Sequence, residues 1–273
     1  MSEIEKKDFI DVEEVIRNKN PRILKFIPGF LLSYIKRILH QDDVNDFIRR
    51  HGHKTSFDFV DAIITEFGPI VTFEGLENIP VSGGAIIAAN HPMGGLDAMA
   101  LLQVIQKKRL DQKFIVNDVL LSIKSLGNLF IGVNKHGKNS GIVLDKIDNY
   151  YDSETLVLIF PAGLVSRKQN GGIISDLEWK KSFITKAKRF NKPVIPVHIS
   201  GQNSNFFYNL SRWRERLGIK INLEMFYLMD EMYHQSGKSI HVKIGKPIDP
   251  LAFDKQFTDQ EWAQRVKKQV YEL

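Results

Sequence analysis

The stretch AIIAANHPMGGLD, residues 85–97, combines a strand, a turn and the start of a helix. Its first residues form an unbroken apolar run of the kind that makes a buried strand. The run ends in Asn90-His91-Pro92, two glycines then let the backbone turn freely, and Asp97 opens an amphipathic helix. Functional side chains of open α/β sheets tend to lie at the carboxyl ends of strands, which is where His91 falls. The stretch therefore predicts one unit of an α/β sheet with polar groups at its turn.

From about residue 70 onward, on both sides of this unit, short apolar runs recur and are separated by stretches with helical spacing. Strands are expected at residues 70–74, 84–89, 113–117, 156–160, 194–199, 221–225 and 241–244. Helices are expected at residues 97–108, 139–151, 180–189, 204–217 and 259–273. Strands that alternate with helices of crossover length are typical of an α/β domain, with a mostly parallel sheet flanked by helices.

The first 69 residues lack this alternation and are expected to be helical. Residues 42–68 have the spacing of a helical pair, and residues 21–40 mix many large apolar side chains with Arg and Lys but no acid. Pro28 divides that second segment, because its nitrogen has no hydrogen for a helix interior. A wide apolar face flanked by cations is typical of a membrane-interface helix, and a helix packed on the protein's own core is the alternative. We expect an N-terminal helical, membrane-associating region at residues 1–69 and an α/β domain at 70–273.

Composition narrows the class of protein further. The chain has 273 residues, no cysteine and a formal net charge of +6. Without cysteine there is no disulfide, thiolate nucleophile or Cys-ligated metal, and the histidines do not group into a metal site. No stretch reaches the ~20 apolar residues of a membrane span. The acidic start, MSEIEKKDFIDVEE, lacks the apolar core of a signal peptide, so a cytoplasmic location is expected.

The positive charge suits an anionic partner. It is not arrayed with aromatic residues in a recognisable nucleic-acid-binding module, so no nucleic-acid partner is expected. The candidate partners that remain are an anionic membrane surface and a small anionic metabolite.

His91 and Asp97 are the candidate catalytic pair. A histidine that acts as a general base needs one ring nitrogen fixed, so that the other faces the substrate. Asp97 can accept a hydrogen bond from one nitrogen and stabilise the imidazolium that forms. The alternative is that Asp97 only caps the helix that follows, a position that suits Asp well.

Four blocks, in order, resemble the glycerolipid acyltransferase superfamily, whose members are similar to lysophosphatidic acid acyltransferases. They are Asn90-His91-Pro92 with Asp97, LFIGVNK at 129–135, LIFPAGLVSR at 158–167 and KPVIPV at 192–197. The stretch IGKPI at 244–248 is similar to the family's usual ending. The resemblance spans residues 70–250 and leaves the N-terminal region uncovered.

The resemblance implies an acyltransferase fold and transfer of an acyl group from a thioester, acyl-CoA or acyl-carrier protein, to a lipid hydroxyl. His91 would be the general base and Asp97 its orienting partner. Lys135, Ser166 and Arg167 would bind the anionic head of the acceptor. Backbone N–H groups near Gly163 or in the strand with Pro196 are candidates for the oxyanion. Arg167 as part of a solvated loop is the alternative. The thioester is a co-substrate, and neither a resident cofactor nor a metal is expected.

Two departures from the common pattern bear on the acceptor. Five residues separate His91 from Asp97 instead of four, and Ala162 stands where Glu is usual. Glycine at 94 and 95 can absorb the extra residue. A subgroup with Asn-His-Pro-x-Gly-x-x-Asp and Phe-Pro-Ala-Gly motifs is more similar to this chain.

The first expectation for the acceptor is a lysophospholipid such as 1-acyl-glycerol-3-phosphate, in phospholipid biosynthesis at the inner face of the membrane. One alternative is the hydroxyl of an N-(3-hydroxyacyl) amino acid, as in ornithine- or glycine-type lipids. Another is a non-catalytic lipid-binding membrane adaptor. A serine hydrolase built on Ser166 is disfavoured, because no Gly-x-Ser-x-Gly elbow surrounds it.

Overall fold

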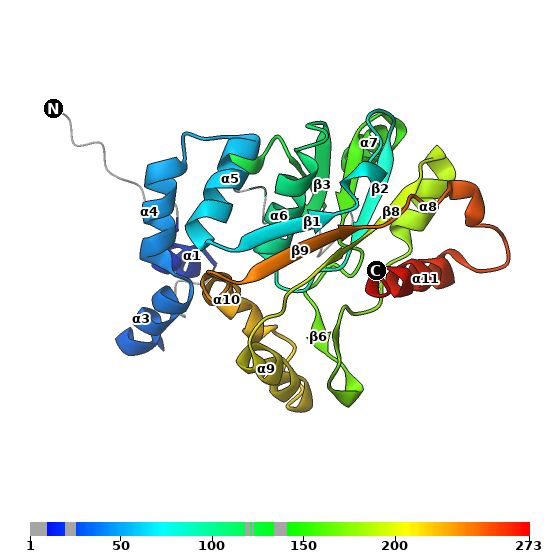
Figure 1. Ribbon diagram of the computed structural model, residues 1–273. Helices are drawn as coiled ribbons and strands as arrows, with labels where there is room; N and C mark the ends of the chain where they lie inside the picture. Colours follow the sequence, from blue (N-terminus) through cyan, green and yellow to red (C-terminus); the bar gives the residue numbers. More distant parts are fainter. Residues whose placement is uncertain (1–9, 20–25, 118–120, 122, 134–140) are drawn as a thin grey trace.

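A seven-stranded sheet forms the centre of the computed structural model, which describes residues 10–19, 26–117, 121, 123–133 and 141–273 (Figure 1). The strands lie in the order β1-β9-β8-β2-β5-β3-β4. Their bounds are β1 Ile70–Glu74, β2 Ala85–Ala89, β3 Gln112–Asn117, β4 Phe130–Val133, β5 Leu156–Ile159, β8 Val194–Ile199 and β9 Ser239–Ile244. In this spatial order, each pair of neighbours from β8 through β2, β5 and β3 to β4 is parallel. Strand β9 pairs antiparallel with β8 and parallel with β1. The predicted α/β fold with a mostly parallel sheet is therefore confirmed.

Helices precede the sheet and cover both of its faces. They are α1 Val12–Lys19, α3 Gly29–Ile38, α4 Gln41–His51, α5 Ser56–Phe67, α6 Gly95–Ile105, α7 Gly141–Asp152, α8 Ser182–Phe190, α9 Asn205–Arg216, α10 Leu228–Tyr233 and α11 Asp259–Tyr271. Short 3₁₀ turns are η1 Leu76–Asn78, η3 Lys124–Leu126, η4 Asn170–Gly172, η5 Leu223–Tyr227 and η6 Pro250–Ala252. A small antiparallel hairpin, β6 Arg167–Lys168 with β7 Ile174–Ser175, projects from the sheet (Figure 1).

Strand β2 lies at the middle of the sheet, between β5 and β8, and all of its residues are buried. Successive side chains of a strand point to opposite faces. Ala85, Ile87 and Ala89 accordingly join the core that includes residues of α5 and α6, whereas Ile86 and Ala88 join the core that includes residues of α7, α8 and α11. Such burial on both faces explains the uninterrupted apolar run in the sequence. It also places the residue pair that follows β2 at the carboxyl edge of a rigid strand.

In the part of residues 1–69 that the structure describes, the regular elements are the helices α1, α3, α4 and α5. Helix α3 begins at Gly29, directly after Pro28, as the missing N–H of proline predicts. The preceding residues 20–25 lie outside the described residues. The rings of Phe26 and Phe30 are 85% and 78% exposed, so the part of this segment that the structure describes does not bury them in the core. Helix α5, in contrast, packs on α6 and ends at Gly68, which has a φ of 64°.

The strand predicted at residues 221–225 is wrong. Residues 223–227 form the 3₁₀ turn η5, and Glu224 within it is completely buried. Its carboxylate accepts hydrogen bonds from Arg167 and Arg214. Because these partners come from β6 and α9, the tertiary ion pairs override the strand preference of a short apolar run.

The structure differs from the prediction in smaller ways as well. The helix predicted from Asp97 begins at Gly95. The hairpin of β6 and β7 and the short helix α10 were not predicted. No helix in the described ranges combines the length and the apolar character that crossing a bilayer requires.

Candidate active site

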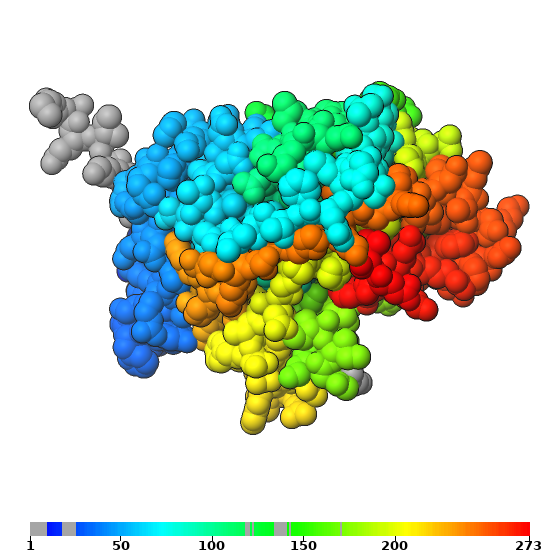
Figure 2. All heavy atoms as spheres, viewed as in Figure 1, coloured from blue at the N-terminus to red at the C-terminus, as the bar shows by residue number. Residues whose placement is uncertain are grey.

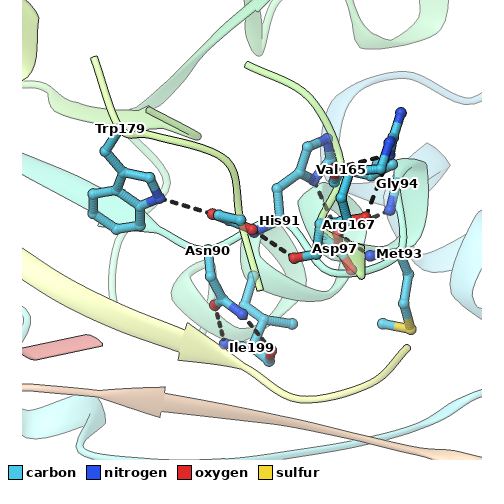
Figure 3. Close-up of polar contacts among 11 residues, drawn as sticks. Asn90, His91, Met93, Gly94, Asp97, Val165, Arg167, Trp179 and Ile199 are labelled. Atoms are coloured by element: carbon cyan, nitrogen blue, oxygen red, sulfur yellow. Dashed lines mark hydrogen bonds and ion pairs between the residues drawn. The ribbon is translucent and has the colours of Figure 1, made fainter. Parts of the chain in front are cut away.

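His91 and Asp97 are in direct contact at the carboxyl end of β2 (Figure 3). The distance from His91 Nδ1 to Asp97 Oδ2 is 2.9 Å. Asp97 is completely buried, whereas the His91 side chain keeps 17% of its surface exposed. The pair thus has a buried acid behind a histidine that reaches the protein surface.

Asp97 also caps its own helix. Its Oδ2 accepts the backbone N–H groups of Met93 at 2.8 Å and Gly94 at 2.9 Å. One carboxylate therefore contacts the His91 ring and also caps the helix, although Gly94, and not Asp97, is the N-cap residue of α6. Since backbone N–H groups can only donate, Oδ2 is an acceptor, and the hydrogen of the His91 contact lies on Nδ1. In the neutral ring, the lone pair then lies on Nε2.

Gly94 absorbs the additional residue between His91 and Asp97. Its φ of 122° and ψ of −131° form a backbone conformation that is open almost only to glycine. A Cβ at this position would also lie 3.3 Å from the Leu228 side chain. Gly94 thus has a conformation that suits the expected role of glycine in this turn, whereas Gly95 is the first residue of α6.

Two neighbouring strands fix the segment that carries His91. The Asn90 side chain donates to the carbonyl of Ile199 at 2.9 Å and accepts from the Ile199 N–H at 2.6 Å, which joins the ends of β2 and β8 (Figure 3). Phe160, directly after β5, stacks on the His91 ring with the centroids 4.0 Å apart. The imidazole is therefore held by a hydrogen bond at one edge and by an aromatic face.

Asp176 is a buried carboxylate of this site that the sequence did not mark. Its Oδ1 accepts the backbone N–H of His91 at 3.1 Å and the Ser166 hydroxyl at 2.6 Å. Its Oδ2 accepts from Trp179 Nε1 at 2.8 Å. Helix α11 contributes Tyr271, whose hydroxyl accepts the Asp176 N–H at 2.8 Å. No local pattern around Asp176 predicts this role, because its partners His91 and Tyr271 lie 85 and 95 residues away in the sequence.

Ser166 and Arg167, predicted as acceptor-binding residues, are brought close to His91 but are buried. The Ser166 N–H donates to the His91 carbonyl at 2.7 Å, and its hydroxyl is engaged by Asp176. Arg167 is only 5% exposed and donates to Glu224 at 2.8 Å. Burial lowers the pKa of Arg167, and the Glu224 carboxylate opposes that shift. The alternative of a solvated loop arginine is therefore wrong.

The other two predicted binding residues differ in position. Gly163 has a φ of 68°, and its N–H donates to the carbonyl of Phe160 at 3.0 Å in a tight turn after β5. Lys135 lies outside the described residues. The structure thus brings Gly163, Ser166 and Arg167 to the same edge of the sheet as His91.

Comparison with known proteins agrees with this geometry. A family model described as "Acyltransferase" matches residues 14–273. This chain belongs to the acyltransferase family. Two relatives in this family are each called lyso-glycine lipid O-acyltransferase. The protein from Bacteroides thetaiotaomicron is 42% identical over 97% of this chain and 97% of its own length. That from Phocaeicola vulgatus is 41% identical over 97% of this chain and 95% of its own length.

A solved structure is also similar to this acyltransferase. It is the 1-acyl-sn-glycerophosphate (LPA) acyltransferase PlsC from Thermotoga maritima. The two chains are 21% identical, with a TM-score of 0.49 over 95% of this chain and 90% of that chain.

Proposed function

We propose that this acyltransferase moves a fatty acyl group from a thioester to the hydroxyl of a lyso-glycine lipid, an N-(3-hydroxyacyl) amino acid. The carrying observation is its identity of 42% and 41% with two lyso-glycine lipid O-acyltransferases over nearly their whole lengths. Of the acceptors that the sequence left open, this supports the amino-acid lipid over 1-acyl-glycerol-3-phosphate. The contact between His91 and Asp97 supports an enzyme over a lipid-binding adaptor, since a binder has no need of it.

The geometry supports direct transfer with His91 as general base. Nδ1 of His91 donates to Asp97, so Nε2 is the nitrogen that can take the proton of the acceptor hydroxyl. The hydroxyl oxygen attacks the thioester carbonyl as that proton moves to Nε2. Collapse of the tetrahedral intermediate forms the ester and expels the thiolate, which takes the proton back from the imidazolium. The Asp97 carboxylate stabilises the imidazolium between these steps.

The acceptor carries a carboxylate from its glycine, which needs a cation or hydrogen-bond donors. We propose Lys135 as a cation for this carboxylate. Ser166 and Arg167 were also expected to bind this group, but the Ser166 hydroxyl donates to Asp176 and the Arg167 guanidinium donates to Glu224. They hold the segment after β5 against His91. The N–H of Gly163 already donates to the carbonyl of Phe160, so it is not a ready donor for the oxyanion.

A long acyl chain prefers the bilayer, so we propose peripheral binding at the cytoplasmic face of the membrane. The exposed rings of Phe26, just before α3, and Phe30, in its first turn, lie near Lys36 and Arg37 in sequence. An apolar surface bordered by cations suits a bilayer with anionic headgroups. The acyl donor, acyl-CoA or acyl-carrier protein, is a co-substrate that arrives from the aqueous side.

An acyl-transfer assay tests the proposal. Purified protein in detergent micelles receives labelled acyl-CoA or acyl-carrier protein, with N-(3-hydroxyacyl)glycine and 1-acyl-glycerol-3-phosphate as competing acceptors. We expect label in the glycine lipid, and a loss of about 10²–10⁴-fold in His91→Ala. His53→Ala is the matched control, because His53 is exposed in a loop. Label only in phosphatidic acid would contradict the proposed acceptor. Undiminished acyl transfer by His91→Ala would contradict the proposed mechanism.

A further inference from the structure

Helix α9 has an apolar stripe on its outward face. Phe206, Leu210, Trp213 and Leu217 follow each other at helical spacing, and the side chains of Phe206, Trp213 and Leu217 are 53%, 63% and 65% exposed. The opposite face of the helix already packs on the protein through buried Phe207, Tyr208 and Ser211. A surface helix normally presents polar residues on its outer side. The outward stripe therefore needs a partner outside the molecule.

The apolar surface continues beyond the helix. After Gly218, the side chains of Ile219, Ile221 and Phe226 are 36%, 65% and 46% exposed. Figure 2 shows this part of the chain, in yellow, as a projection at one end of the molecule. Contiguous exposed apolar patches of this kind mark interaction sites.

Cations border this surface. Arg212, Arg216 and Lys220 lie along it, and Arg216 and Lys220 are exposed. The single acid of the same segment, Glu215, already pairs with Arg214. A tryptophan among aliphatic side chains and cations is the composition that proteins use at the membrane–water interface. Each cation close to an anionic bilayer strengthens the attraction to its headgroups.

We propose that this surface docks the enzyme on an anionic lipid bilayer. The surface, called the α9 face, comprises Phe206, Trp213, Leu217, Ile219, Ile221 and Phe226. The choice of a bilayer rests on the proposed function, since its acceptor is a lipid, and on the fit between bordering cations and anionic headgroups. The site is separate from the exposed rings of Phe26 and Phe30, although η5 contacts α3 where the Tyr34 hydroxyl lies 2.6 Å from that of Tyr227.

The α9 face is tied rigidly to the catalytic segment. Arg167 in β6 donates to Glu224 in η5, which also accepts from Arg214 of α9. The residue before Arg167 donates its N–H to the His91 carbonyl. Docking of this face thus fixes the orientation of the His91 edge of the sheet relative to the bilayer, where a membrane-resident acceptor enters.

Quenching of Trp213 by lipid bromine tests the inference directly. The full-length protein is mixed with vesicles of equal parts phosphatidylglycerol and phosphatidylcholine, with the phosphatidylcholine acyl chains brominated or not. Trp179 is completely buried and Trp262 packs between Phe253 and Phe257, so Trp213→Phe isolates the signal of interest. We expect bromine to quench the wild type and to leave Trp213→Phe nearly unchanged. Equal quenching of both proteins would overturn the inference.

Vesicle sedimentation provides the second measurement. The double variant W213S/L217S should lower the lipid partition coefficient by about tenfold, because two interfacial apolar side chains are lost. R212Q/R216Q should weaken binding to these vesicles and flatten its salt dependence. V81S/L251S is the matched control, since Val81 and Leu251 are 76% and 81% exposed but lie elsewhere. Equal partitioning of W213S/L217S and wild type would count against the α9 face.

Two further outcomes separate the alternatives. A concentration-dependent dimer that W213S/L217S abolishes, without bromine quenching, would assign the α9 face to a second copy of the chain. His91→Ala should bind vesicles like the wild type. If quenching is present while the micelle assay shows no acyl transfer, the docking surface stands and the proposed function fails.

Discussion

The carboxylate of Asp176 accepts a hydrogen bond from the backbone N–H of His91, at 3.1 Å and across 85 residues of sequence. The carbonyl of His91 accepts from the N–H of Ser166 at 2.7 Å, and the hydroxyl of Ser166 returns to Asp176 at 2.6 Å. Both polar backbone groups of His91 are thus fixed by the segment after β5. Asp97 fixes the ring, and Asp176 fixes the backbone that carries it. Asp176 is a positioning residue on this reasoning.

Asp176→Asn should lower kcat by roughly tenfold to a hundredfold, since small displacements of a catalytic group are costly. The amide replaces one acceptor oxygen by an NH₂ group, which then opposes the donors of His91 and Ser166 or that of Trp179. Steady-state kinetics with both substrates measures the effect, and the KM of the acyl donor should change little.

Ser166→Ala is the control for this prediction. It removes one donor to Asp176 and keeps the other contacts, so its kcat should fall less than that of Asp176→Asn. Wild-type kcat in Asp176→Asn, measured well below its unfolding temperature, would contradict a positioning role.

Asp97→Asn and Asp97→Ala should separate catalysis from helix capping. The Asn oxygen can still accept the N–H groups of Met93 and Gly94, but it does not stabilise an imidazolium. We expect kcat to fall by about 10²–10⁴-fold with little change in Tm. The alanine leaves these buried donors without their acceptor and should also lower the free energy of unfolding by about 1–3 kcal/mol. Steady-state kinetics and thermal unfolding, measured on both variants, distinguish the catalytic role of Asp97 from its capping role. Equal stability losses in the two variants would argue that the charge, rather than the capping oxygen, holds the helix.

The unit from β2 to α6 was predictable because its determinants are local. The apolar run of β2, the glycines and the spacing of His91 and Asp97 all lie within residues 85–97. The turn brings the two side chains close together, and distant segments then hold the backbone of His91 in place. Strand order and register, in contrast, follow from how the crossovers pack, so the sequence indicated a mostly parallel sheet but not the antiparallel position of β9.

The contacts of Asp176 and Arg167 could not be read from the sequence. An aspartate in a polar stretch and an arginine in a loop both look solvated, and their burial depends on partners from α11 and η5. Glu224 in turn pairs with Arg167 and Arg214, and residues 223–227 around it form a 3₁₀ turn in place of the predicted strand. Ion pairs between distant segments therefore decide the parts of the site that local patterns miss.

Gly94→Ala should destabilise the protein and impair the site together. The new Cβ would meet a φ of 122° and lie 3.3 Å from Leu228. Backbone strain of this kind costs about 1–3 kcal/mol, and the turn that holds Asp97 against His91 would shift. Chemical denaturation and kcat measure the two effects. Gly29→Ala is the matched control, because nothing lies within 4 Å of its added Cβ and its φ is not positive. Full activity in Gly94→Ala would contradict the need for glycine at this turn.

Glu224→Gln should lower the free energy of unfolding by about 3–5 kcal/mol, the usual cost of breaking a buried ion pair. Glu224 is completely buried between Arg167 and Arg214, whose side chains are 6% and 10% exposed. Loss of its charge leaves the buried guanidinium of Arg167 without its counter-ion and Arg214 with only the exposed Glu215, and the amide NH₂ opposes the donors of both arginines. Urea unfolding at neutral pH measures the change.

Glu215→Gln is the control for this ion-pair network, because Glu215 also contacts Arg214 but is 59% exposed. Exposed pairs contribute less than about 1 kcal/mol, so this variant should remain close to the wild type. In Glu224→Gln we also expect reduced kcat in detergent micelles, since β6 loses its anchor to η5 next to the segment that holds His91. Equal stability of the two variants would show that solvent reaches the buried pair, and would remove the rigid connection between η5 and the catalytic segment.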